Sequence, residues 1–136
     1  MKSLTLTALL VSTAIAPVAL AESAPVQYDA NGDYLSTDHL YWTVTDPDEN
    51  GLNCRWSEDM PEAWYAPDAQ FPLMNVREWE VVRSFDYGTV LMANRTPAGF
   101  VTLNDDRGLP WLKVSIGDND EICLARANRD FIRPLD

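Results

Sequence analysis

The strongest constraint on the fold is a series of short segments rich in β-branched and aromatic residues. Turn residues separate these segments at short intervals. After position 21, no stretch of eleven or more residues keeps its apolar residues at helical spacing. Short strands with closely spaced turn signals are typical of all-β barrels and sandwiches. The pattern predicts strands over residues 41–45, 52–56, 78–85, 89–94, 100–103, 111–116, 122–125 and 131–133.

The first 21 residues have the features of an export signal. Lys2 gives a basic start, residues 4–16 are almost wholly apolar, and Ala19-Leu20-Ala21 has the small-x-small spacing of a signal peptidase site. We expect cleavage after Ala21 and export to the periplasm or the medium, with the thylakoid lumen as a further compartment. The alternative is an uncleaved anchor, but the apolar stretch is shorter than the roughly 20 residues of a spanning helix. No membrane insertion is therefore expected after cleavage.

The remaining chain of about 115 residues is long enough for one domain with a modest core. Residues 22–40 are polar, contain the turn cluster Asp29 to Asp33, and are predicted to form an N-terminal arm or irregular cap. Residues 41–136 form the predicted domain. Within it, residues 57–75 carry three prolines and several aromatic residues without a clear period, which indicates a long loop.

The chain is strongly acidic. Loss of Lys2 with the signal leaves 9 basic against 21 acidic residues, a net charge of −12. Affinity for nucleic acids comes largely from cationic residues that release counterions from phosphates. The composition therefore argues against nucleic acid as a partner.

Two cysteines, Cys54 and Cys123, lie in a chain with an export signal. In an oxidising compartment, an even pair without CxxC spacing is most simply one disulfide. The alternative is that one of them acts as a nucleophile.

Four segments occur in the order found in bacterial SH3-like (SH3b) domains. Leu52-Asn53-Cys54-Arg55 resembles the opening "LNVR" strand, residues 81–91 look like a hairpin closed by a glycine turn, residues 109–114 are similar to the "gWykV" strand, and residues 123–132 resemble the closing segment. The resemblance spans about residues 52–135 and is greatest to secreted proteins of cyanobacterial type. It departs from the family in a larger first loop and in Ile122-Cys123, which replaces the usual "GW".

The resemblance implies an all-β fold: a small SH3-like β-barrel of five or more short strands, with a long first loop and a short helical turn before the last strand. If the first and last segments of such a barrel are neighbours, a Cys54–Cys123 disulfide ties an early strand to a late one, within the geometric limits of such a bond.

Asp46-x-Asp48-x-Asn50-Gly51 matches the opening of a calcium-binding EF-hand loop. The twelfth position of that loop, which needs a bidentate acid, is Ser57, and the flanking segments are predicted strands. A turn is therefore the preferred interpretation, with a calcium site of another kind as the alternative. We predict no metal and no cofactor.

Catalytic chemistry has little support. His39 is the single histidine and lies in the predicted arm, so a Ser/His or Cys/His arrangement would need a residue outside the domain. We predict a protein that is not an enzyme and has no catalytic residues.

Aromatic residues give the best indication of a ligand site. In the SH3 family the corresponding first loop flanks a groove that receives extended or proline-rich peptides. By this resemblance the predicted ligand-binding residues are Trp56, Trp64, Tyr65 and Trp111. The alternative is that these rings cover one end of the barrel, and Trp42 and Trp79 are assigned to packing.

The sequence thus predicts an extracytoplasmic, non-catalytic binding module for peptidoglycan peptide or another extended peptide. The alternative is a structural or accessory subunit of an extracytoplasmic protein complex, which would use the same loop or the arm. Arg126, Arg129 and Arg133 are expected to pair with acidic residues or to receive a ligand carboxylate.

Overall fold

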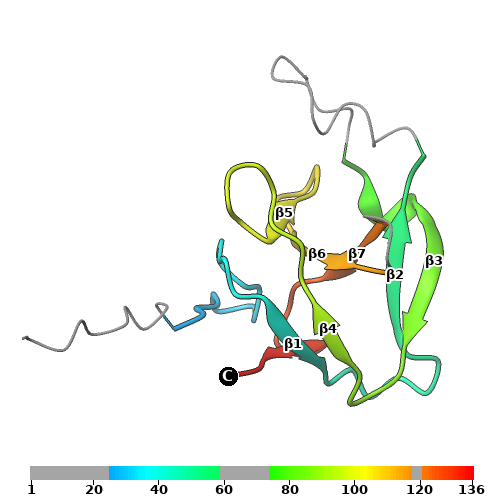
Figure 1. Ribbon diagram of the computed structural model, residues 1–136, viewed down its shortest axis with the longest axis horizontal. Coiled ribbons are helices and arrows are strands. Elements are labelled where there is room, and N and C mark those ends of the chain that lie inside the picture. Colours follow the sequence, from blue (N-terminus) through cyan, green and yellow to red (C-terminus); the bar gives the residue numbers. More distant parts are fainter. Residues whose placement is uncertain (1–24, 59–73, 118–120) are drawn as a thin grey trace, which may run out of the picture.

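The computed structural model describes residues 25–58, 74–117 and 121–136, which form eight strands and one turn of 3-10 helix. The elements are β1 (Tyr41–Val44), β2 (Leu52–Trp56), η1 (Val76–Glu78), β3 (Glu80–Phe85), β4 (Val90–Met92), β5 (Thr102–Asn104), β6 (Pro110–Ser115), β7 (Ile122–Arg126) and β8 (Ile132–Pro134). They build two antiparallel sheets, ordered β4-β1-β8 and β3-β2-β7-β6-β5 (Figure 1).

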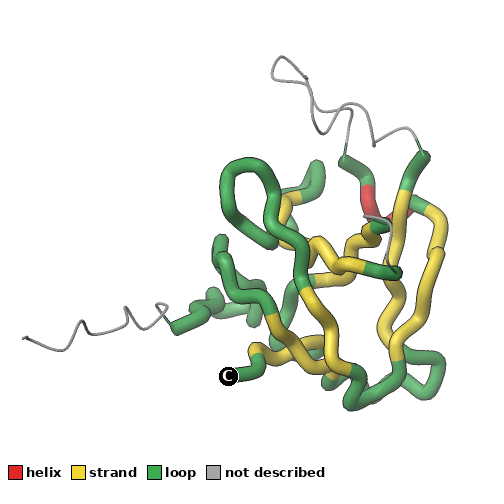
Figure 2. Tube along the Cα trace, viewed as in Figure 1, coloured by secondary structure: helices red, strands yellow, loops and turns green. Residues whose placement is uncertain are grey.

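The prediction of an all-β fold is confirmed, and each predicted range overlaps an observed strand. The strands form two sheets, however, and not one closed barrel (Figure 2). The sheets meet at an isolated bridge between Ala93 and Val114, where the Asn94 N–H donates to the Lys113 carbonyl at 2.8 Å. This bridge connects the end of β4 to β6 without continuing as a ladder.

The main core lies between the two sheets. Because successive residues of a strand point to opposite faces, every second residue contributes to it. The core residues include Trp42 and Val44 from β1 and Leu112 and Val114 from β6. Burial of these inner faces explains why the short predicted segments are rich in β-branched and aromatic residues.

The predicted disulfide between Cys54 and Cys123 is present, and both residues are fully buried. It connects β2 and β7, neighbouring strands of the five-stranded sheet that are 69 residues apart in sequence. The bond therefore ties an early strand to a late one, as the resemblance implied. Such a bond fits an oxidising compartment.

The expected hairpin of residues 81–91 does not form. β3 pairs with β2 and β4 pairs with β1, so the turn around Gly88 carries the chain from one sheet to the other. The reason lies in the hydrogen bonds of the turn, because the Gly88 N–H donates to the Val44 carbonyl and the Val44 N–H donates to the Thr89 carbonyl. A glycine turn between two strands does not determine which strands they pair with.

The acidic segment 46–51 is a turn built by its own side chains. The Asp46 carboxylate accepts the N–H of Asp48, and the Asp48 carboxylate accepts the N–H of Asn50, each at 2.9 Å. Gly51 closes the turn at φ 80°, and a Cβ there would lie 2.7 Å from the Phe85 carbonyl oxygen. Both the backbone angle and the close approach require glycine.

The N-terminal segment docks on the end of β7 and the turn that follows it. Tyr34 is buried in the main core and donates its hydroxyl to the Ile132 carbonyl at 2.8 Å. Asp33 forms an ion pair with Arg126 at 2.6 Å and also accepts the side-chain amide of Asn128. Part of the predicted arm thus contributes to the core.

Before β8, the Asn128 carbonyl accepts the N–H groups of Phe131 and Ile132. The short helical turn expected here is a single hydrogen-bonded turn and not a helix.

Candidate functional site

A second cluster of apolar side chains lies on the outer face of the five-stranded sheet. Trp111 and Leu124 alternate along their strands with residues of the main core, so they point away from the three-stranded sheet. The cluster consists of Val76, Trp111 and Leu124, with Trp56, Met74, Trp79 and Leu103 packed against them. We call these seven residues the tryptophan cluster.

Two of the four predicted ligand-binding residues, Trp56 and Trp111, meet in this cluster. The other two, Trp64 and Tyr65, lie outside the described residues. The cluster includes residues at both ends of the long loop, since Trp56 ends β2 and Met74 begins the next described range.

Trp111 forms the base of the cluster and offers little surface to a ligand. Only 6% of it is exposed, and its indole N–H donates to the Asp105 carboxylate at 3.0 Å. The other carboxylate oxygen of Asp105 accepts the backbone N–H groups of Arg107 and Leu109, both at 2.9 Å. Asp105 thus holds the turn before β6 and fixes the orientation of the Trp111 ring.

The pKa of Asp105 reflects these contacts. Burial alone would raise it, but the hydrogen bonds donated by Trp111, Leu109 and Arg107 favour the carboxylate and hold the pKa below its ordinary value. Because the folded-state pKa is lower than the unfolded one, this stabilisation is fully present above about pH 4 and is lost as pH falls through the folded-state pKa.

We expect Asp105→Asn to lower the free energy of unfolding by about 1–2 kcal/mol at pH 7, because the amide cannot replace a carboxylate with three donors. The difference from the wild type should shrink as pH falls through the folded-state pKa of Asp105, which lies below its ordinary value, because the wild-type carboxylate then becomes protonated. Urea unfolding at pH 7 and at a series of decreasing acidic pH values measures the effect, and Asp106→Asn, at the exposed neighbour, is the control. A destabilisation that stays the same over the whole pH series would contradict this role.

Trp56 and Trp79 form the accessible part of the cluster. Both are partly exposed, and their rings meet edge to face with centroids 6.2 Å apart. The Trp79 indole N–H donates to the side-chain oxygen of Asn75 at 3.0 Å, and the Asn75 amide donates to Glu78 at 2.7 Å. These hydrogen bonds hold the Trp79 ring in place.

The assignment of Trp79 to packing is confirmed, since Trp79 packs in the tryptophan cluster, but its ring contact with Trp56 was not foreseen from the sequence. Trp79 lies just after η1, where it caps the 3-10 turn, and β3 begins at the next residue. A three-residue turn of this kind has no periodic signal. The nearest sequence signal was the position of Trp79 just after the proline-rich loop.

The three arginines near the C-terminus have separate structural roles. Arg126 pairs with Asp33, as expected for an excess of acidic residues. The Arg129 guanidinium lies over the Tyr28 ring, 4.4 Å from its centroid, and donates to the Tyr28 hydroxyl. Arg133 donates to the Arg129 carbonyl.

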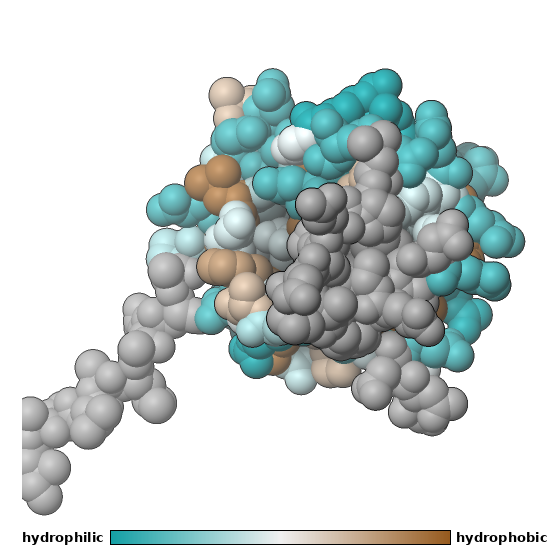
Figure 3. Space-filling model, turned by 90° about the horizontal axis from the view of Figure 1, so that it is seen from above, coloured by the Kyte–Doolittle hydropathy of each residue, from teal (hydrophilic) through white to brown (hydrophobic). Residues whose placement is uncertain are grey.

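A separate pocket, lined by both polar and apolar residues, lies between the N-terminal segment and the loop before β5. Its volume is about 480 Å³, and its lining includes Val26, Leu35, Ala98 and Phe100. Leu35 and Phe100 are 48% and 46% exposed. Figure 3 shows a group of hydrophobic side chains, in brown, on the left of the described part of the molecule.

Within residues 25–58, 74–117 and 121–136, no three His, Cys, Asp or Glu side chains are grouped so that they could hold a metal ion. In the same part of the chain, no helix has the length and apolar character needed to cross a bilayer.

Fold and site together define a disulfide-linked, all-β domain with a tryptophan cluster on the outer face of one sheet. Comparisons with protein-family models, with curated proteins and with solved structures found no match to this chain.

Proposed function

We propose that this protein is an extracytoplasmic, non-catalytic module that binds cell-wall peptide, or another extended peptide, at the tryptophan cluster. The observation that carries the proposal is the Trp56–Trp79 pair: two partly exposed rings in edge-to-face contact, one of them anchored through its indole N–H. Large planar side chains fixed in this way bury much area on binding and lose little conformational entropy.

An SH3-like architecture is part of the proposal. It is supported by the order of the short strands and by the position of the tryptophan cluster at the two ends of the long loop. In SH3 domains such a loop borders a groove for extended peptides. Trp64 and Tyr65 remain predicted contacts of this groove.

Export of the protein is the second part of the proposal. The buried Cys54–Cys123 disulfide suits an oxidising compartment outside the cytoplasm. Together with the signal-like residues 1–21, it favours the periplasm, the medium or the thylakoid lumen as the site of action.

A pull-down on purified peptidoglycan sacculi tests the function. We expect Trp79→Ala or Trp56→Ala to weaken binding at least tenfold, because truncation of a central aromatic anchor typically costs about 2 kcal/mol or more. Tyr87→Ala is the matched control, since this aromatic side chain is 70% exposed and belongs to the turn between the sheets. Equal recovery of all four proteins, or of none, would contradict the proposed site.

A structural or accessory subunit remains the second candidate, and the pocket beside Leu35 and Phe100 favours it. Two half-exposed apolar side chains around a pocket suit the insertion of a partner's apolar residue. Copurification from native envelope or thylakoid fractions, compared with Phe100→Ser, distinguishes this function from peptide binding. A wholly monomeric, unassociated pool would contradict it.

A further inference from the structure

Two arginines lie next to Trp79. Arg55, on β2, donates from Nη1 to the Trp79 carbonyl at 2.9 Å. Arg77, in η1, precedes Trp79 by two residues, and its Nη1 is buried without a hydrogen-bond partner. Among the residues that the structure describes, neither arginine forms an ion pair with a carboxylate.

An unpaired guanidinium nitrogen is unexpected in this protein. A buried donor without a partner carries the full cost of its lost hydration, and the cost is larger for a charged group. The chain has 21 acidic residues and 10 basic ones, so a carboxylate partner is easy to supply from within. An arginine that lacks one beside a surface aromatic cluster suggests that the partner belongs to a ligand.

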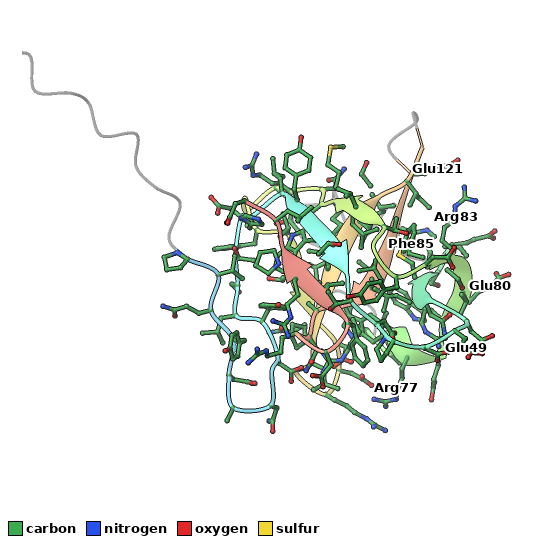
Figure 4. The ribbon with its side chains drawn as sticks, turned by 90° about the horizontal axis from the view of Figure 1, so that it is seen from below. Glu49, Arg77, Glu80, Arg83, Phe85 and Glu121 are labelled. Carbon is green, nitrogen blue, oxygen red and sulfur yellow. A yellow bond between two sulfur atoms is a disulfide. The ribbon has the colours of Figure 1, made fainter. Side chains whose placement is uncertain are left out.

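Two acidic residues near Arg77 in the described part of the chain do not fill this role. Glu78 accepts the side-chain amide of Asn75. Glu80 is exposed and lies opposite Trp56 in the pairing of β2 with β3. Figure 4 shows Arg77 and Glu80 on the same side of the molecule. Glu80 therefore adds a negative charge near Trp56 that repels an anionic ligand.

We propose that Arg55 and Arg77 receive a carboxylate of the bound peptide, so that the ligand is an extended peptide with a carboxylate beside the segment that contacts Trp56 and Trp79. The planar fork of arginine matches a carboxylate and can bind it through two parallel hydrogen bonds. This inference rests on the proposed function and specifies the chemistry of its ligand. The carboxylate belongs either to a peptide terminus or to an acidic side chain.

Sacculi whose carboxylates have been converted to amides with a carbodiimide provide the test. For the wild-type protein we expect about tenfold weaker binding to amidated than to untreated sacculi, since hydrogen bonds to a charged group contribute at least this factor. Arg77→Gln and Arg55→Gln should weaken binding to untreated sacculi to the same degree and abolish the difference between the two preparations.

Matched variants give the comparison its controls. Arg95→Gln removes an exposed arginine that bonds the Asp38 carbonyl, and it should keep the wild-type preference. Glu80→Gln should strengthen binding to untreated sacculi, because it removes the repelling charge. Arg77→Lys keeps the charge but not the fork, and it should retain only part of the preference. Thermal melts of the oxidised proteins verify that each variant is folded.

The outcomes separate the two proposals. Equal binding of untreated and amidated sacculi, still lost in Trp79→Ala, would overturn the carboxylate assignment and leave the proposed function intact. A preference that survives in both Arg77→Gln and Arg55→Gln would overturn the assignment to these arginines. Binding to neither preparation would overturn the proposed function itself.

Competition with two synthetic peptides locates the carboxylate. Acetyl-Ala-Ala-Pro-Ala with a free C-terminus competes if a peptide terminus is recognised, and acetyl-Ala-Glu-Pro-Ala amide competes if a side chain is recognised. Either result supports the proposal.

Discussion

Replacing Cys54 and Cys123 together by alanine is expected to lower the free energy of unfolding by about 4 kcal/mol, because a long cross-link restricts the unfolded chain. The bond joins residues 69 positions apart and encloses much of the described domain. Both cysteines are fully buried, so the alanine variant also loses packing around the two sulfur positions. For a domain of this size the expected loss is a large part of the total stability.

Urea unfolding of the oxidised wild type, the reduced wild type and the Cys54→Ala/Cys123→Ala variant measures this effect. The wild type should be reduced in denaturant, since its buried bond is protected in the folded state. Reductant should leave the double variant unchanged, which provides the control. Equal midpoints for the oxidised and reduced wild type would show that the bond does not stabilise the fold.

Trp42→Ala is expected to cost about 3–5 kcal/mol, the usual range for truncating a buried tryptophan. Trp42 is fully buried at the centre of β1, between strands β4 and β8 of its sheet. Its ring meets Tyr34 and His39 edge to face, with centroids 5.0 and 5.5 Å away. Its indole N–H donates to the His39 carbonyl at 2.8 Å. The substitution therefore opens a cavity between the sheets and leaves that carbonyl without its donor.

Tyr41→Ala is the matched control, because Tyr41 precedes Trp42 in the same strand but points outward with 51% of its surface exposed. We expect it to cost less than about 1 kcal/mol. Chemical denaturation of the two variants, monitored by far-UV circular dichroism, gives the comparison. Similar losses for both would contradict the placement of the core between the two sheets.

The strands were predictable from sequence because their β-branched and aromatic residues and the turn residues between them form a local pattern. Val44 and Leu112, for example, point into the core from alternating segments. The pairing of the strands was harder to predict from the sequence. The turn at Gly88 was expected to close a hairpin. Its backbone groups instead form hydrogen bonds with Val44 of β1. Which strand supplies those bonds depends on contacts between residues distant in sequence, and local patterns do not record them.

Part of the candidate site was also predictable. The aromatic residues around the long loop pointed to Trp56 and Trp111, which the fold brings into one cluster. Arg55 and Arg77 could not be recognised, because their significance depends on the approach of β2 to the segment after η1. An arginine in an acidic chain normally finds an acidic partner, and the sequence does not show that Nη1 of Arg77 lacks a hydrogen-bond partner among the described residues.

The most direct test of peptide binding at the tryptophan cluster is the indole N–H region of the nitrogen-15 NMR spectrum during titration with soluble muropeptides. The signals of Trp56 and Trp79, assigned with the alanine variants, should shift and saturate. The signal of Trp42, whose N–H is held by the His39 carbonyl inside the core, should stay unchanged. A titration in which the signals of Trp56 and Trp79 do not move, or in which that of Trp42 moves as much as they do, would contradict binding at this cluster.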